Sequence, residues 1–177
     1  MSCALTTGYA LGCRNSVGGI KNVRLAAYSG VTVATNGSGT VTGVTVSPAS
    51  GFYLYNLPEQ TSQFTETMTA SRENGSLFYQ QDLQMIMNKS SVALRNEIRL
   101  LAQNRLVAIV QDRNNTFWML GSDNGLMLSA GTTNSGTAMG DRNGYDITLT
   151  SLESVPMFAV SSGIVAALTN STQITPV

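Results

Sequence analysis

Histidine is absent from this sequence and charged residues are scarce. Without histidine the chain has no Ser-His-Asp triad, no Cys-His pair and no histidine-ligated zinc. Charged residues make up 11% of the chain, against the ~25% usual for globular domains. Ten cationic side chains balance ten anionic ones, so the formal net charge is zero. That balance argues against nucleic-acid binding by charge neutralisation, and it removes the repulsion that opposes self-association.

Cysteine is nearly absent as well. Cys3 and Cys13 are too few for a four-ligand zinc site, and the chain has no Cys-x-x-Cys motif. Two interpretations of this pair stay open: a disulfide near the N-terminus, or two free thiols in a reducing cytoplasm. No apolar run reaches the ~20 residues that cross a bilayer, so we expect no membrane partner. We also expect no enzymatic activity, no cofactor and no bound metal, because the residues form no recognisable catalytic or ligand set.

The pattern that dominates the sequence is that of short β-strands. Valine alternates with polar or small residues over 31–33 and 41–46, the period of a half-buried strand. Asn36-Gly37-Ser38-Gly39 between them predicts a turn. Further strands are expected at 51–55, 106–110, 116–120, 126–128, 145–150, 157–160 and 164–168, with a loop over 130–140. The run at 106–110 is apolar throughout, which predicts burial on both faces.

Residues 62–88 predict one long β-hairpin. An alternating run from Phe64 to Ala70 leads into the turn 72–75, which ends in Asn-Gly. Residues 77–87 then run back with most of their apolar side chains on one parity. The Gln, Leu and Met content of the second half also suits a helix, and a helix there remains the alternative.

One clear helix is predicted at approximately 91–102. Ser90 or Ser91 is a suitable N-cap. Leu94, Ile98 and Leu101 stand at helical spacing and form a single apolar stripe. We expect these three side chains to dock the helix onto the sheets.

The predicted fold class is therefore mainly β: a β-sandwich or barrel with one flanking α-helix and a long hairpin. The chain contains no linker and no repeat of fixed period, which predicts a single domain over 1–177. Residues 1–20 and 169–177 are candidates for terminal arms.

The layout resembles the tail tube proteins of long-tailed bacteriophages and their relatives in type VI secretion tubes. The residues that carry the resemblance lie within 60–165: the long hairpin, the helix, the strands at 106–112 and 116–120, and the segment from Ser135 to Leu149. Head–tail connector proteins share much of this layout. Residues 1–58 lie outside the resemblance.

The resemblance implies a virion structural protein, made in the host cytoplasm and located in the tail. It implies homohexameric rings that stack into a tube or connector, with a continuous sheet lining a channel for DNA. The implied partners are other copies of the chain, other tail or connector proteins, and DNA in transient, non-specific contact. Two other classes remain open: a capsid decoration or fibre protein, and a jelly-roll carbohydrate-binding module.

The hairpin supplies the residues predicted to face the channel. Because strand side chains alternate faces, its polar parity presents Thr65, Thr67, Thr69, Gln80, Asp82 and Gln84 together. A lumen of Thr and Gln with sparse negative charge lets DNA slide, since phosphate is held mainly by Lys and Arg. Glu66 falls on the apolar parity and does not fit this scheme. The alternative is an ordinary solvent-exposed sheet face.

Overall fold

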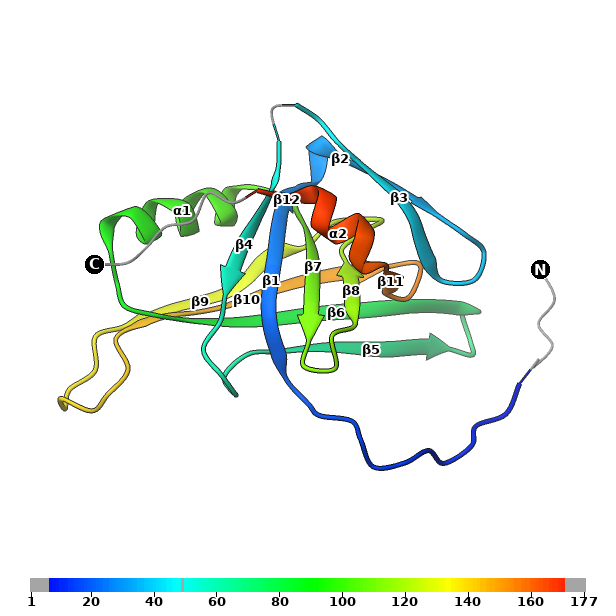
Figure 1. The fold of residues 1–177 in the computed structure, drawn as a ribbon, viewed down its shortest axis with the longest axis horizontal. Coiled ribbons are helices and arrows are strands. Elements are labelled where there is room, and N and C mark those ends of the chain that lie inside the picture. The colour runs from blue at the N-terminus through cyan, green and yellow to red at the C-terminus, as the bar shows by residue number, and fades with distance from the viewer. Residues whose placement is uncertain (1–6, 49, 171–177) are drawn as a thin grey trace.

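The computed structural model describes residues 7–48 and 50–170 (Figure 1). The strands are β1 (Ile20–Ala27), β2 (Val31–Thr35), β3 (Thr40–Val46), β4 (Phe52–Asn56), β5 (Gln63–Ser71), β6 (Ser76–Asn88), β7 (Leu106–Asp112), β8 (Phe117–Leu120), β9 (Met127–Asn134), β10 (Gly144–Glu153), β11 (Phe158–Val160) and β12 (Thr169–Asn170). The helices are η1 (Tyr28–Gly30), a single 3-10 turn, then α1 (Val92–Gln103) and α2 (Ser162–Leu168).

The strands form two sheets that face each other. Sheet A has eight strands in the order β12-β4-β1-β7-β8-β11-β3-β2, and sheet B has four in the order β5-β6-β10-β9. Sheet B is antiparallel throughout. The predicted class, mainly β with a sandwich and one flanking helix, is confirmed, and the two sheets stay separate instead of closing into a barrel.

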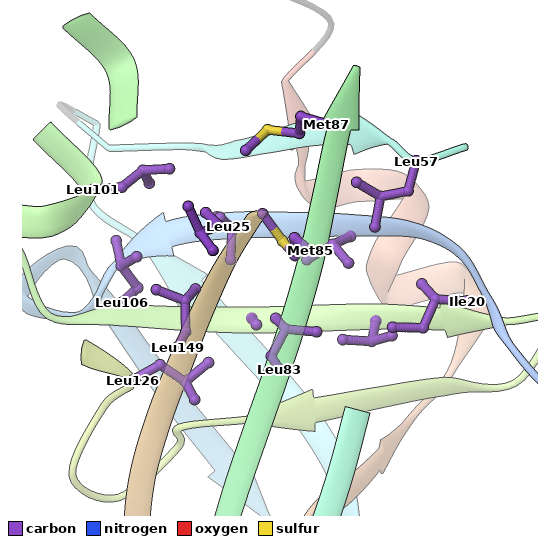
Figure 2. Packing of buried hydrophobic residues seen from close by; sticks show 14 of the residues in the cluster. Ile20, Leu25, Leu57, Leu83, Met85, Met87, Leu101, Leu106, Leu126 and Leu149 are labelled. Carbon is purple, nitrogen blue, oxygen red and sulfur yellow. The ribbon is translucent and has the colours of Figure 1, made fainter. Parts of the chain in front are cut away.

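Strand β7 lies between the two hydrophobic cores. Leu106, Ala108 and Val110 belong to the core between the sheets, and Figure 2 shows Leu106 within it. Val107 and Ile109 point the other way, into a second core that is covered by α2 and by valines of β2 and β3. All five side chains are buried. The two-faced burial predicted for 106–110 is confirmed.

The long hairpin is present as β5 and β6. Its strands pair from Gln63 opposite Gln84 to Ser71 opposite Ser76, without a break in register. Gly75 in the turn has a φ of 61°, a left-handed conformation that glycine adopts at little cost. The helical alternative for 77–88 was wrong, because burial of one side of this segment outweighs its helix propensity.

Helix α1 begins where the capping pattern predicts. The Ser91 hydroxyl oxygen accepts a hydrogen bond from the Leu94 backbone N–H at 3.1 Å. Leu94 and Leu101 are each 6% exposed within the core between the sheets, and half-buried Ile98 packs against that core.

Two segments differ from expectation. Residues 164–168 form part of helix α2 instead of a strand; Val165 is buried in the second core. A five-residue apolar run does not distinguish strand from helix by period, and its two alanines favour a helix. Residues 130–134 belong to strand β9 instead of a loop, because they pair with β10 despite their Gly, Thr and Asn content.

The docking of α1 gives a first prediction. Leu94→Ala and Leu101→Ala should each lower the free energy of unfolding by ~2–5 kcal/mol, because each leaves a cavity in the core. Leu100→Ala is the matched control, since Leu100 on the same helix is 48% exposed. Urea denaturation measures all three. Equal stability of the three variants would show that the helix is not held through this stripe.

Candidate functional site

Sheet B has one face in the core and one face turned away from it. On the core side Leu83, Met85 and Leu149 are 0% exposed. The side chains between them along each strand point to the opposite side, which we call the polar face. Its central members are Thr65, Thr67 and Thr69 of β5, Gln80, Asp82 and Gln84 of β6, and Asp146, Thr148 and Thr150 of β10. Toward the end of the sheet that holds the β5–β6 turn, the same face also carries the exposed apolar side chains of Phe78, Met127 and Leu152.

The six residues predicted to face a channel all lie on the polar face. Thr65 stands opposite Asp82, and Thr67 stands opposite Gln80. The three threonines are exposed, whereas the three β6 residues are half-buried because they lie between two neighbouring strands. The hairpin therefore presents these side chains as two adjacent polar rows.

Strand β10 contributes polar residues that the sequence analysis missed. It pairs with β6 over ten residue pairs, from Gly144 opposite Asn88 to Glu153 opposite Tyr79. The alternation of β10 signals a two-faced strand, but nothing local to the sequence identifies β6 as its partner across a separation of more than 50 residues. Long-range pairing therefore supplies one of the three strands, and three of the nine central residues, of the polar face.

Hydrogen bonds connect the polar face across its strands. The Thr150 hydroxyl donates to Asp82 Oδ1 at 2.5 Å, and the Gln80 amide donates to Asp82 Oδ2 at 2.9 Å. The Gln84 amide donates to both carboxylate oxygens of Asp146, at 3.0 and 3.2 Å. These bonds hold both aspartates in place as acceptors, which leaves a fixed array of short polar side chains.

The electrostatics of sheet B are one-sided. Its four strands contain Glu66, Asp82, Asp146 and Glu153 but neither Lys nor Arg. One cation contacts a residue of the polar face: the guanidinium of Arg142, in the loop before β10, lies 3.8 Å from Asp146 Oδ2. A polyanion at this face meets weak negative charge, hydroxyl and amide groups, and the uncharged side chains of Phe78, Met127 and Leu152.

Glu66 has a structural role that explains its position on the core parity. Its Oε1 accepts hydrogen bonds from the Gln81 amide at 3.0 Å and from the Met157 backbone N–H at 2.7 Å. Gln81, which is 1% exposed, accepts in turn from the Gly121 backbone N–H at 3.0 Å. Glu66 thus ties the hairpin to the turn after β8 and to the segment before β11.

Glu153 is a second buried carboxylate with a structural role. It is 1% exposed and accepts from the Asp123 backbone N–H at 2.7 Å and from the Asn124 N–H at 3.1 Å. The Ser151 hydroxyl donates to it as well. Within residues 7–48 and 50–170, no buried side-chain nitrogen or oxygen lacks a hydrogen-bond partner. The carboxylates of Glu66 and Glu153 therefore serve to hold loops against sheet B.

Among the described residues, both edges of sheet B are strands without a further neighbour in the sheet, β5 on one side and β9 on the other. A groove of about 440 Å³ runs beside β9 under helix α1. It is lined by Arg95, Asn96, Ile98, Arg99 and Ala102 of α1, by Leu128, Gly131, Thr132 and Thr133 of β9, and by Tyr145 and Ile147 of β10. At the opposite edge, the Met68 side chain of β5 is 70% exposed.

The described part of the chain contains no group of three His, Cys, Asp or Glu side chains that could hold a metal ion. In the same part of the chain, no helix is long and apolar enough to cross a membrane.

The terminal segments are only partly described. Cys13 is exposed, whereas Cys3, and with it the choice between a disulfide and two free thiols, lies outside the described residues. In the predicted arm 1–20, residues 7–18 are exposed and belong to no strand. The Asn114 side chain fastens this segment by bonding the backbone N–H and C=O of Val17, both at 2.9 Å. In the predicted arm 169–177, Thr169 and Asn170 form β12 beside β4, and 171–177 lie outside the described residues.

Comparison with models of known protein families finds no match, and comparison with curated proteins finds none either.

The loop between β9 and β10, residues 135–143, extends from one end of sheet B (Figure 1). Asp141 organises it: its Oδ2 accepts from the backbone N–H groups of Ala138 and Thr137, each at 2.8 Å, and from the Thr137 hydroxyl at 3.0 Å. The hydrogen bond from Ala138, with those from Thr137, lowers the pKa of Asp141.

This loop gives a prediction on pH. A lowered pKa means that the carboxylate holds the loop at neutral pH and releases it only as the pH falls through that lowered value. The amide resonances of Thr137 and Ala138 should therefore titrate below the ordinary aspartate value of ~3.9. In Asp141→Asn the same resonances should lose this titration. A midpoint at or above the ordinary value in the unaltered chain would contradict the assignment.

Proposed function

We propose that the chain is a virion structural protein of a bacteriophage tail, a subunit of a homo-oligomeric ring whose sheet B lines a channel for DNA. The observation that carries the proposal is the polar face: an open sheet surface of Thr, Gln and hydrogen-bonded Asp on strands without Lys or Arg. Stacked rings would form a tail tube or a head–tail connector.

The strand directions of sheet B suit a closed ring. Neighbouring strands alternate in direction, so in a sheet of four β9 runs opposite to β5. A second copy related by rotation about the ring axis brings its β5 beside β9 as an antiparallel neighbour. Such head-to-tail contacts generate rings when the rotation closes. Each added copy continues the same antiparallel pattern.

The dimensions suit a duplex. With strands ~4.8 Å apart, six copies of a four-stranded sheet enclose a circumference of ~115 Å, a backbone diameter of ~37 Å before strand tilt is counted. Tilt widens the ring further. After side chains occupy the wall, the remaining space accommodates double-stranded DNA.

The chemistry of the polar face suits sliding instead of binding. DNA is held chiefly through Lys and Arg that displace its counterions. The short hydroxyl and amide side chains of the polar face provide no such contact, and Asp82 and Asp146 repel phosphate weakly. DNA therefore passes without being retained.

The carbohydrate-binding alternative lacks its main requirement, an exposed group of aromatic rings. Trp118 and Tyr55 both pack against the core between the sheets. The Tyr55 hydroxyl lies 3.4 Å from Glu97 of α1, and burial, with the Glu97 charge, raises the pKa of Tyr55. Tyr53 is 41% exposed. Of these three rings only Tyr53 is exposed, and a single ring does not provide a sugar-stacking surface.

Assembly is the first test of this proposal. Light scattering of the purified protein over a concentration series, with negative-stain electron microscopy, should show rings or stacked tubes. A chain that stays monomeric at the highest concentration would exclude the ring.

Labelling then tests which face lines the lumen. In a Cys3→Ser/Cys13→Ser background, Thr67→Cys and Gln84→Cys should react with a bulky thiol reagent in free subunits and be shielded in assembled tubes. Thr45→Cys is the matched control: Thr45 is exposed on β3 of sheet A and should react in both states. Equal reaction of Thr67→Cys in both states would place the polar face outside the channel.

A further inference from the structure

We infer that neighbouring copies join by pairing β9 of one with β5 of the next at an offset of six residues, with Met68 of the second copy filling the groove between α1 and β9. This inference rests on the proposed ring and specifies its joint. It follows from the strand registers, the parity of the side chains and the shape of the groove.

The two edge strands lie at different levels along sheet B. Strand β5 is level with residues 76–84 of β6. Strand β9, followed through its pairing with β10, is level with residues 82–88 of β6. Figure 1 shows the same displacement: the β5–β6 turn extends from one end of sheet B and the β9–β10 loop from the other. A copy placed at the same level would overlap β9 over only a short stretch, so full pairing needs a shifted neighbour.

The displacement of the neighbouring copy along the strands, counted in residues, is limited to two values. It must be an even number of residues, because an odd shift would put polar-face residues opposite core-face residues. Of the even shifts, only four and six place the whole of β9 opposite β5. Over four strands at ~4.8 Å spacing and ~3.3 Å rise per residue, these shifts give strand tilts of ~35° and ~46°. Closed barrels tilt their strands by roughly 35–45°, and the tilt obtained here does not depend on the number of copies.

The groove selects the six-residue shift. With a shift of six residues, Met68 of the neighbouring copy stands opposite Gly131. With a shift of four residues, Glu66 of the neighbouring copy stands there instead. Gly131 leaves the wall of the groove open, since the nearest atoms to an added Cβ are Ile147 Cγ2 and Leu128 Cδ2 at 3.7 and 3.8 Å. A long, flexible methionine side chain fits an apolar space of this kind, whereas Glu66 is already bonded to Gln81 and to a backbone N–H.

The polar face accepts this register as well. The six-residue shift sets Thr132 of one copy opposite Thr67 of the next, a cross-strand Thr–Thr pair of the kind that stabilises sheets. The four-residue shift instead sets Thr132 opposite Thr65, so these pairs distinguish the two registers.

Disulfide trapping tests the register directly. In the Cys3→Ser/Cys13→Ser background, Thr132→Cys combined with Thr67→Cys should form intermolecular disulfides on mild oxidation of assembled protein. The matched control is Thr132→Cys with Thr65→Cys, which makes the same chemical change two residues away. Directly opposite cysteines approach to the ~5.5 Å Cα separation that a disulfide needs, and diagonal ones remain ~7–8 Å apart.

The outcomes separate the register from the ring. A series of cross-linked oligomers from Thr132→Cys with Thr67→Cys, and few from Thr132→Cys with Thr65→Cys, supports the six-residue joint. Preferential cross-linking of Thr65 overturns it in favour of the four-residue shift and leaves the ring intact. Rings seen by microscopy with neither pair cross-linked overturn the joint alone. A monomeric protein overturns both proposals.

The groove contact has its own test. Met68→Ala should weaken self-association about tenfold or more, because the buried thioether chain is lost. Met139→Ala is the matched control, since Met139 lies fully exposed in the 135–143 loop. Gly131→Val, whose added Cβ meets only ordinary van der Waals contacts within its own subunit, should block association while leaving the melting temperature unchanged. Unaltered association of both Met68→Ala and Gly131→Val would rule out the groove.

Discussion

The pairing of β6 with β10 is the constraint on which the rest of the molecule depends. Each strand has one apolar and one polar parity, and the register places Leu83 opposite Leu149 so that the two apolar sides coincide. A slip of one residue would turn Leu149, Ile147 and Tyr145 out of the core and carry Thr and Asp into it. The core between the sheets, the polar face and the levels of the two edge strands all follow from this one alignment.

The polar groups buried beside this pairing reinforce it. Gln81 and Glu153 stand on the core side of β6 and β10, and both bond backbone N–H groups of the segment that follows β8. In a shifted register these groups would be buried without partners, at a cost of about 1–3 kcal/mol each or more for the charge. The network therefore penalises misaligned states and fixes where the loops return to the sheet.

Sequence patterns predicted the elements whose signal is local. Four patterns each predicted the structure that is present: the Ser91 cap, the apolar stripe of α1, the alternation of the β5–β6 hairpin and the apolar run of β7. The patterns did not predict features that depend on distant partners. Strand β9 is held by β10 despite weak strand propensity, α2 is indistinguishable by period from a short strand, and Glu66 finds its donors at Gln81 and Met157. The polar face was predicted on β5 and β6 alone, because these two strands are consecutive in the sequence and pair with each other through a short turn.

The open edges of sheet B have a consequence for the chain before it assembles. Natural proteins usually protect edge strands with lysine, proline, bulges or inward charges. Strands β5 and β9 contain no Lys, Arg or Pro; β5 has one inward charge, Glu66, and the pairing of β9 with β10 has one irregularity in register. Edges with so little protection pair with other extended chains, so concentration determines the fate of newly made subunits. Ordered growth then requires that a first ring, on which others can stack, forms before the concentration of free subunits rises. The timing of synthesis becomes as important to the outcome as the affinity of the contacts.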